Sequence, residues 1–306
     1  MVIIAIMIKF IALIPSYNRS SILKKTLKSI CFKKSIDSIA LVIQYDNPTE
    51  EKNYKELLKN LNDYCEKEVI AIQYNKPIGS AKSRKIGLEL ISQLFSRSYG
   101  VMILEDDFIL PGGEDIFKII RHDFELSSKI GCVIGKVVDL RKRKIDPDFY
   151  ISNPTLATSL TKATGYVFVT KPKHDTMMRT IFGPQFMTVR LSLVKGGVNY
   201  DECYLGTGFR EETDLQMQIF TNGYVSLYDS RIKVYHFALE YGGNRAINAV
   251  TSRSYWKARN HIRFLRKYFR DKKKIYYMMM SSMLLTLYCP IAFPWILRGI
   301  NEGYKK

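Results

Sequence analysis

The feature that most constrains this chain is a regular alternation of short apolar runs with amphipathic segments. Apolar runs rich in β-branched residues predict strands, and apolar residues spaced three and four apart predict helices. The expected strands are 8–14, 38–44, 69–73, 100–104, 131–136, 166–169 and 225–227. The expected helices are 21–28, 50–64, 80–95, 115–125 and 212–221. This alternation predicts an α/β fold whose mostly parallel sheet is covered by helices on both faces.

The chain is long enough for one large α/β domain with an appendage, since it has 306 residues of which 46% are hydrophobic. Residues 1–15 are mostly apolar and could be taken for a secretory signal peptide. They lack the basic start of such a signal, and no small-residue cleavage site follows them. We therefore expect a buried first strand that ends at Pro15.

Charge and cysteine content indicate the kind of partner and the compartment. The formal net charge of +18 predicts an anionic partner without identifying it. The five cysteines stand far apart, without a CxxC pair, so the sequence indicates neither a zinc module nor a disulfide framework. A reducing, cytoplasm-facing location fits this pattern best. The cysteines are Cys31, Cys65, Cys132, Cys203 and Cys289.

The C-terminal region combines positive charge with apolar length. Residues 253–274 carry ten Lys or Arg and one acid, which is half of the net charge, and 275–297 carry no charge. The second segment is long enough to span a bilayer as a helix. Pro290 and Pro294 would kink such a helix, so a re-entrant or interfacial segment is as consistent with the sequence as a straight span. A soluble helical hairpin is the alternative. We predict that 253–300 contacts the cytoplasmic face of the cell membrane, where anionic headgroups attract basic residues. Aromatic residues among the charges also suit single-stranded nucleic acid.

Polar clusters follow four of the expected strands, at 16–19, 45–48, 75–80 and 105–107. The carboxyl ends of parallel strands meet at one edge of a sheet, where ligands bind. The turn at 75–80 opens a helix with several basic residues, a placement that suits phosphate. We therefore expect one binding site at this edge.

Acidic residues form two clusters. Glu105, Asp106 and Asp107 repel one another unless a cation shares them, and Mg²⁺ or Mn²⁺ takes oxygen ligands. A solvated acidic turn is the competing interpretation. Glu211, Glu212 and Asp214 begin a later helix, where acids also occur simply because they stabilise a helix N-terminus. The two clusters would repel nucleic acid, so we expect no nucleic-acid partner.

These motifs, in this order, closely resemble those of inverting family 2 glycosyltransferases of the GT-A fold. The motifs are PSYNR at 15–19, Asp46, the helix with Gly79, Arg84 and Gly87, ILEDD at 103–107, GFREETDL at 208–215 and VYH at 234–236. The resemblance implies a nucleotide-sugar-dependent GT-A domain over 1–250, followed by a basic helix and apolar tail over 251–306.

The resemblance also implies roles for individual residues. Asp107 and His236 match metal ligands for Mn²⁺ or Mg²⁺. Glu212 matches the catalytic base beside Glu211, although Glu stands where the family has Asp, and Asp214 is a second candidate for the base. The residues that match the nucleotide-sugar site are Pro15, Tyr17, Arg19, Asp46, Gly79, Arg84, Glu105 and Asp106.

The activity so implied is inverting transfer from a nucleoside-diphosphate sugar to a hydroxyl acceptor, with a lipid-linked glycan as the expected acceptor. Residues 149–163 and 182–186 are expected on the acceptor side. The alternatives are a polyprenyl-phosphate sugar synthase and a catalytically silent nucleotide-sugar-binding protein on a membrane. The sequence leaves the sugar, the nucleotide and homo-oligomer formation open.

Overall fold

The computed structural model describes residues 8–96, 99–140, 150–170, 176–237, 239, 249–269, 276–277, 279–280, 282–284 and 290–305. The strands are β1 (Lys9–Tyr17), β2 (Ile36–Gln44), β3 (Glu68–Tyr74), β4 (Tyr99–Ile103), β5 (Phe108–Ile109), β6 (Ile130–Asp139), β7 (Tyr150–Ile151), β8 (Val169–Thr170), β9 (Met177–Thr180), β10 (Met187–Arg190) and β11 (Val225–His236). The helices are α1 (Ser20–Cys31), α2 (Pro48–Lys59), α3 (Ser80–Leu94), α4 (Asp115–Glu125), α5 (Pro154–Thr164), α6 (Leu191–Lys195), α7 (Glu211–Thr221), α8 (Val250–Tyr268) and α10 (Phe293–Lys305), with short 3-10 turns η1 (Leu61–Asp63) and η3 (Pro290–Ala292).

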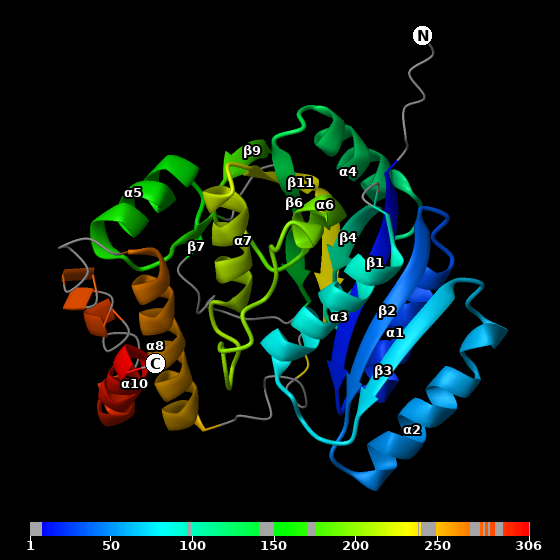
Figure 1. Ribbon diagram of the computed structural model, residues 1–306, viewed down its shortest axis with the longest axis horizontal. Helices are drawn as coiled ribbons and strands as arrows, with labels where there is room; N and C mark the ends of the chain where they lie inside the picture. Colours follow the sequence, from blue (N-terminus) through cyan, green and yellow to red (C-terminus); the bar gives the residue numbers. More distant parts are fainter. Residues whose placement is uncertain are drawn as a thin grey trace.

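One mixed sheet organises the molecule (Figure 1). Its strand order is β3-β2-β1-β4-β10-β6-β11-β5, and β9 pairs with β11 off this path. The strands β3, β2, β1 and β4 are parallel to one another, as are β6 and β11. The short β10 joins the two halves and runs antiparallel to both of its neighbours. The expected α/β fold with a mostly parallel sheet is confirmed.

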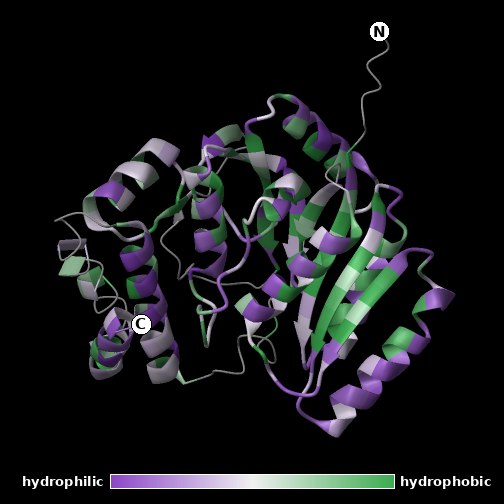
Figure 2. Cartoon of the chain, in the orientation of Figure 1, coloured by the Kyte–Doolittle hydropathy of each residue, from purple (hydrophilic) through white to green (hydrophobic). Residues whose placement is uncertain are grey.

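Helices cover both faces of this sheet. Apolar side chains of α1, α2 and α4 pack against one face, and those of α3, α6 and α7 against the other. Figure 2 shows the central strands in the hydrophobic colour and the outer side of α2 in the hydrophilic colour. At Gly87 of α3, an added Cβ would lie 2.2 Å from Leu13 of β1, so glycine lets this helix approach the sheet closely.

Most long elements lie where they were predicted, whereas four short strands and two helices were not predicted. The helix at 115–125 has the predicted bounds, while the one predicted at 50–64 ends at Lys59 and is followed by η1. The strand expected at 225–227 continues to His236, and that expected at 166–169 is reduced to β8. The elements not predicted are β5, β7, β9, β10, α5 and α6, none of the strands among them exceeding four residues.

The cysteine interpretation is wrong in one respect. Cys31, at the end of α1, forms a disulfide with Cys65, and their Cα atoms are 4.9 Å apart. The two residues are separated by 34 positions, and only packing of the α1 end against the segment after η1 brings them together. The argument from cysteines to a reducing location therefore no longer holds.

The C-terminal helices pack on the rest of the molecule. In α8, Asn260, His261 and Phe264 have no exposed surface. Two glycines of α10 allow this helix to lie close against α8. A Cβ atom at Gly299 would be 2.3 Å from the Tyr255 carbonyl oxygen, and a Cβ atom at Gly303 would be 2.5 Å from the Arg259 carbonyl oxygen. No helix within the described part of the chain is long and apolar enough to cross a membrane. Within 275–297, where the span was expected, residues 275, 278, 281 and 285–289 lie outside the described residues.

One buried carboxylate makes stability depend on pH. Asp123 of α4 has no exposed surface, and its Oδ1 lies 3.6 Å from His122 Nδ1 and 3.9 Å from Arg231 Nη2, both beyond hydrogen-bond distance. Burial, and then the nearby Asp229, raise the pKa of Asp123 to about 6. The folded protein therefore holds a proton that the unfolded chain releases near pH 4, so the free energy of unfolding falls as pH rises from about 4 to about 6.

We expect Asp123→Asn to stabilise the protein above pH 6. The gain at pH 7.5 should be on the order of 2 kcal/mol, because one unit of pKa shift corresponds to about 1.4 kcal/mol. At pH 4 the variant and the parent should have similar free energies of unfolding, as measured by urea titration. A loss of stability at pH 7.5 would contradict this account of Asp123.

Candidate functional site

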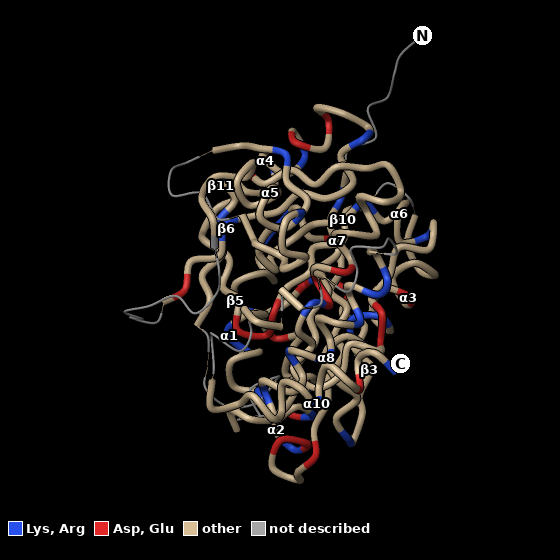
Figure 3. Tube along the Cα trace, turned by 90° about the vertical axis from the view of Figure 1, so that its left-hand side faces the viewer, with Lys and Arg blue, Asp and Glu red and all other residues tan. Residues whose placement is uncertain are grey.

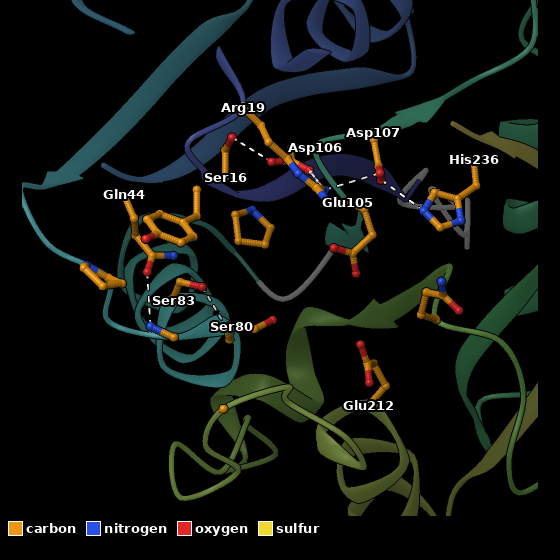
Figure 4. A pocket seen from close by; sticks show the side chains of 16 residues that line it. Ser16, Arg19, Gln44, Ser80, Ser83, Glu105, Asp106, Asp107, Glu212 and His236 are labelled. Atoms are coloured by element: carbon orange, nitrogen blue, oxygen red, sulfur yellow. Dashed lines mark hydrogen bonds and ion pairs between the residues drawn. The ribbon is translucent and has the colours of Figure 1, made fainter. Parts of the chain in front are cut away.

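A pocket of about 480 Å³ lies where β1, β2 and β4 end (Figure 4). It opens beside the start of α3 and faces α7. Nine of the thirteen residues singled out in the sequence line it: Pro15, Tyr17, Arg19, Gly79, Glu105, Asp106, Asp107, Glu212 and His236. The carboxyl edge of the sheet therefore does bring together the polar clusters that follow separate strands.

Arg19 holds the acidic turn after β4 in place. Its Nη1 lies 3.0 Å from Asp106 Oδ1 and 3.3 Å from Asp107 Oδ2. Ser16 donates a hydrogen bond of 2.8 Å to the other oxygen of Asp106. Burial raises the pKa of Asp106 to about 7 although Arg19 opposes the shift. Arg19 and Ser16 thus fix the Asp106 carboxylate, which is 5% exposed, in the wall of the pocket.

Asp107 and His236 form the end of the pocket. Asp107 Oδ1 lies 3.2 Å from His236 Nε2, and the backbone N–H of Leu239 donates to Asp107 Oδ2 at 3.3 Å. The described residues contain no group of three or more His, Cys, Asp or Glu side chains arranged to hold a metal ion. A carboxylate and an imidazole that face a pocket do fit a cation that completes its coordination with phosphate and water, as Mg²⁺ commonly does.

Asp46 lies at the rim and outside the lining of the pocket. Tyr17 donates to Asp46 Oδ2 at 2.5 Å, and Asn18 Nδ2 donates to Oδ1 at 2.7 Å. The hydrogen bond from Tyr17 is the main cause of a lowered pKa of Asp46. Asp46 was expected to line the pocket, but it is connected to the pocket only through Tyr17.

The start of α3 forms the opposite wall. Gly79 has a φ of +89°, a conformation that glycine adopts without strain, and Ser80 and Ser83 follow it along the pocket. Gln44 Oε1 accepts hydrogen bonds from the backbone N–H groups of Ile78 and Gly79, at 2.7 and 3.1 Å. The end of β2 thereby fixes the turn that leads into the helix.

Arg84 was expected near a diphosphate, but the structure places it behind the pocket. Its side chain is 1% exposed and forms ion pairs with Glu105 and Glu211. A third carboxylate oxygen, Glu212 Oε1, lies 3.7 Å away. Figure 3 shows acidic positions gathered in the middle of the molecule with basic positions among them. Arg84 therefore joins the end of β4 to the start of α7 by neutralising their carboxylates.

Glu212 is the carboxylate of α7 that reaches the pocket. Its side chain is 26% exposed, whereas that of Glu211 is 1% exposed and accepts a 2.7 Å hydrogen bond from Ser80. Burial raises the pKa of Glu212, and Arg84 opposes the shift. Glu212 therefore combines access to the pocket with an affinity for protons above that of an ordinary glutamate.

Asp214 does not belong to this site. It has no exposed surface, and Lys267 of α8 lies 2.8 Å from its Oδ1. Tyr204 donates to the same oxygen at 3.0 Å, and Gln218 donates to Oδ2 at 2.7 Å. The suggestion that Asp214 could replace Glu212 as base is therefore corrected, because Asp214 connects α7 to α8.

Several of the charges on α8 point inward. Arg263 lies 2.8 Å from Asp201, Lys267 pairs with Asp214, and Arg259 donates to the carbonyl of Cys203 at 3.0 Å. The sequence suggested that the basic residues of this segment face lipid headgroups. These three instead attach α8 to the loop before α7 and to α7 itself.

A second pocket, of about 260 Å³, adjoins the first. Gln185 and Glu212 line both pockets. Its other walls come from two segments, 166–169 and 183–184, and from the loop 207–210 with the first turn of α7. The loop 182–186, expected on the acceptor side, contributes to this wall, whereas 149–163 does not contribute to it.

Several pocket residues were not among the site residues named individually from the sequence. Ser16 and Ser80 lie within the polar clusters predicted at 16–19 and 75–80, and Gln44 could have been found by its place at the end of β2. Ser80 and Ser83 face the pocket from the first turn of α3. Gln185 lies in the loop 182–186 that was expected on the acceptor side, and Gly206 lies just before the motif at 208–215.

Comparison with solved structures places this geometry in a known architecture. A mannosyltransferase from Pyrobaculum calidifontis, solved with GDP-Man and Mn²⁺, matches 97% of this chain and 75% of its own at a TM-score of 0.53 and 12% identity. The chain has a GT-A fold. GalNAc-T7, solved with UDP, GalNAc and Mn²⁺, matches 98% of this chain at a TM-score of 0.63 and 12% identity, and the match covers 57% of GalNAc-T7.

A third structure with this fold is S. aureus TarS 1–349 in complex with UDP-GlcNAc, which matches 92% of this chain and 71% of its own at a TM-score of 0.55 and 13% identity. No model of a known protein family matches the chain. A search of curated proteins found no match either. The GT-A assignment therefore rests on the shared three-dimensional arrangement.

Proposed function

We propose that this protein is an inverting glycosyltransferase that moves a sugar from a nucleoside-diphosphate sugar to a hydroxyl acceptor. The observation that carries the proposal is the position of Glu212, whose carboxylate lies on the boundary between two pockets. The larger pocket ends in Asp107 and His236 and would hold the donor. The smaller pocket would hold the acceptor, with its hydroxyl against Glu212.

The residues of the chain suit a direct displacement. Glu212 would accept the proton of the acceptor hydroxyl. At the same time the acceptor oxygen would bond to C1 of the donor sugar, and the bond from C1 to the diphosphate would break. Attack from the side opposite the leaving group inverts the anomeric centre. Asp107 and His236 would hold a Mn²⁺ or Mg²⁺ ion, which when bound supplies positive charge for the departing diphosphate.

The experiment that tests this function is release of nucleoside diphosphate from UDP-, GDP- and dTDP-sugars. We expect release from one nucleotide class in the presence of Mn²⁺, and loss of that release when EDTA removes the metal. The named structural neighbours bind GDP-Man, UDP or UDP-GlcNAc, which supports this choice of donors. Absence of release from every donor would argue for a catalytically silent protein.

We also propose that the C-terminal segment contacts a membrane surface. Ile291 is 87% exposed, and Trp295 and Leu297 are 41% and 49% exposed at the start of α10. Exposed apolar residues of this size commonly enter the interfacial region of lipid bilayers.

Flotation with phosphatidylglycerol-containing vesicles tests the membrane proposal. The parent protein should float, and the double variant Ile291→Asp with Trp295→Asp should float far less. Leu126→Asp is the matched control, because Leu126 is 50% exposed at the end of α4, in another part of the molecule. Equal flotation of parent and double variant would remove this surface as the contact.

A further inference from the structure

One face of α8 packs against the loop before α7. Asn260 Nδ2 donates to the Leu205 carbonyl at 2.8 Å. Arg259 Nη1 donates to the Cys203 carbonyl at 3.0 Å and to Asn260 Oδ1 at 2.9 Å, so the two side chains of α8 also hold one another. Asn260 has no exposed surface, and Arg259 is 3% exposed. Because the loop at 203–205 belongs to no helix or strand, these buried hydrogen bonds fix the path of its backbone.

Gly206, the next residue of this loop, lines the larger pocket with bare backbone and is partly exposed. Its φ is +65°, and an added Cβ would lie 2.3 Å from the ring of Trp256 in α8. The Trp256 ring therefore fills the space where a side chain would lie. Within the described part of the chain, the N–H and C=O of Gly206 form no hydrogen bond. This wall thus offers one donor and one acceptor to a molecule in the pocket.

The proposed function places the donor sugar at this wall. Asp107 and His236, which would bind the metal at the diphosphate, lie across the pocket from Glu212 (Figure 4). C1 of the sugar is bonded to the diphosphate and must lie within reach of an acceptor oxygen at Glu212, so the sugar would lie between these groups. Gly206 enters the pocket from the loop that leads into α7, the helix that carries Glu212. The backbone of Gly206 would therefore face the sugar, while the nucleoside extends toward the ends of β1 and β2.

We infer that Asn260 is a positioning residue for the donor sugar. By holding the Leu205 carbonyl, it fixes Gly206 where the backbone of that glycine bonds to a sugar hydroxyl. This inference rests on the proposed function and adds a residue of the C-terminal helix α8 to the donor site. Arg259 and Trp256 support the same stretch of backbone. A nucleoside diphosphate that lacks the sugar does not use this wall, so its affinity does not depend on Asn260.

The test measures the binding of a nucleotide sugar and of its nucleoside diphosphate separately. The probes are UDP-GlcNAc with UDP, GDP-Man with GDP, and dTDP-glucose with dTDP, each titrated calorimetrically with Mn²⁺ and without an acceptor. In Asn260→Ala, the Kd of the nucleotide sugar that binds should rise by roughly three- to tenfold, the value of one hydrogen bond. The Kd of the matching nucleoside diphosphate should stay at that of the parent protein. No rise, or an equal rise for both ligands, would overturn the inference and leave the proposed function standing.

Arg266→Met is the matched control for a general loosening of α8. Arg266 lies on the same helix, but it donates to the Gly303 carbonyl of α10 at 3.1 Å. This variant should lower the melting temperature and leave both dissociation constants at the parent values. A selective loss of nucleotide-sugar affinity in Arg266→Met as large as that in Asn260→Ala would contradict a specific role of Asn260.

Trp256→Leu keeps the test decisive if Asn260→Ala does not fold. Trp256 is only half-buried, and leucine in its place leaves space beside Gly206. The same selective loss of nucleotide-sugar affinity is expected, and an unchanged affinity in the folded variant would count against the inference. Absence of binding by every probe in the parent protein would instead contradict the proposed function, and the inference with it.

Discussion

Glu212→Gln should lower the turnover of sugar transfer by roughly 10²- to 10⁴-fold, the usual contribution of a general base. Glutamine keeps the size of the side chain at the boundary of the two pockets but cannot accept the proton. Binding of the donor should therefore persist in the variant, as measured by calorimetric titration. Glu202→Gln is the matched control, because Glu202 is an exposed carboxylate that pairs with Lys82 and Lys85.

The pH dependence of turnover provides a second measurement on Glu212. Its pKa is raised, so the base becomes protonated, and the rate falls, at a higher pH than for an ordinary glutamate. The residual rate of Glu212→Gln should lack this acidic decline. Turnover close to that of the parent protein in Glu212→Gln would remove Glu212 as the base.

Arg84→Met should strongly destabilise the fold. Arg84 is 1% exposed and neutralises Glu105 and Glu211, the second of which is itself 1% exposed. Removing one partner of a buried ion pair leaves an uncompensated charge and costs about 3–5 kcal/mol. Methionine fills a similar length, so the loss reports mainly on charge.

Lys82→Met is the matched control for Arg84→Met. Lys82 lies on the same helix, but its side chain is 49% exposed and its partner Glu202 is 3.5 Å away. An exposed pair of this kind contributes about 0–1 kcal/mol. Urea titration of both variants measures the difference, and equal losses would contradict the role of Arg84 as the buried charge that joins β4 to α7.

The sequence predicted the pocket residues that come directly after a strand. Strands β1, β2 and β4 are apolar runs that stop at polar residues, and the parallel arrangement brings Arg19, Glu105 and Asp107 together. The sequence could not predict β10, because four residues are too short to show a period, and β10 joins the two halves of the sheet. The disulfide was missed for a similar reason, since its two cysteines meet only through tertiary packing.

Roles within a charged cluster depend on burial, which the sequence does not show. Glu211, Glu212 and Asp214 look equivalent as acids at the start of a helix. In the structure, Glu211 pairs with Arg84, Asp214 pairs with Lys267, and only Glu212 reaches both pockets. The basic residues of α8 were misinterpreted in the same way, because their acidic partners lie about 50 to 60 positions earlier in the chain.

The central claim, that the larger pocket binds a nucleotide sugar together with a metal through Asp107, is tested most directly by thermal stabilisation. A ligand that binds only the folded protein raises its melting temperature. With UDP-, GDP- and dTDP-sugars, we predict that one nucleotide class raises the melting temperature in the presence of Mn²⁺ and much less without it. In Asp107→Asn, the rise in melting temperature above that of the ligand-free variant should lose its Mn²⁺-dependent component. No shift with any donor, or an undiminished Mn²⁺-dependent shift in Asp107→Asn, would contradict the claim.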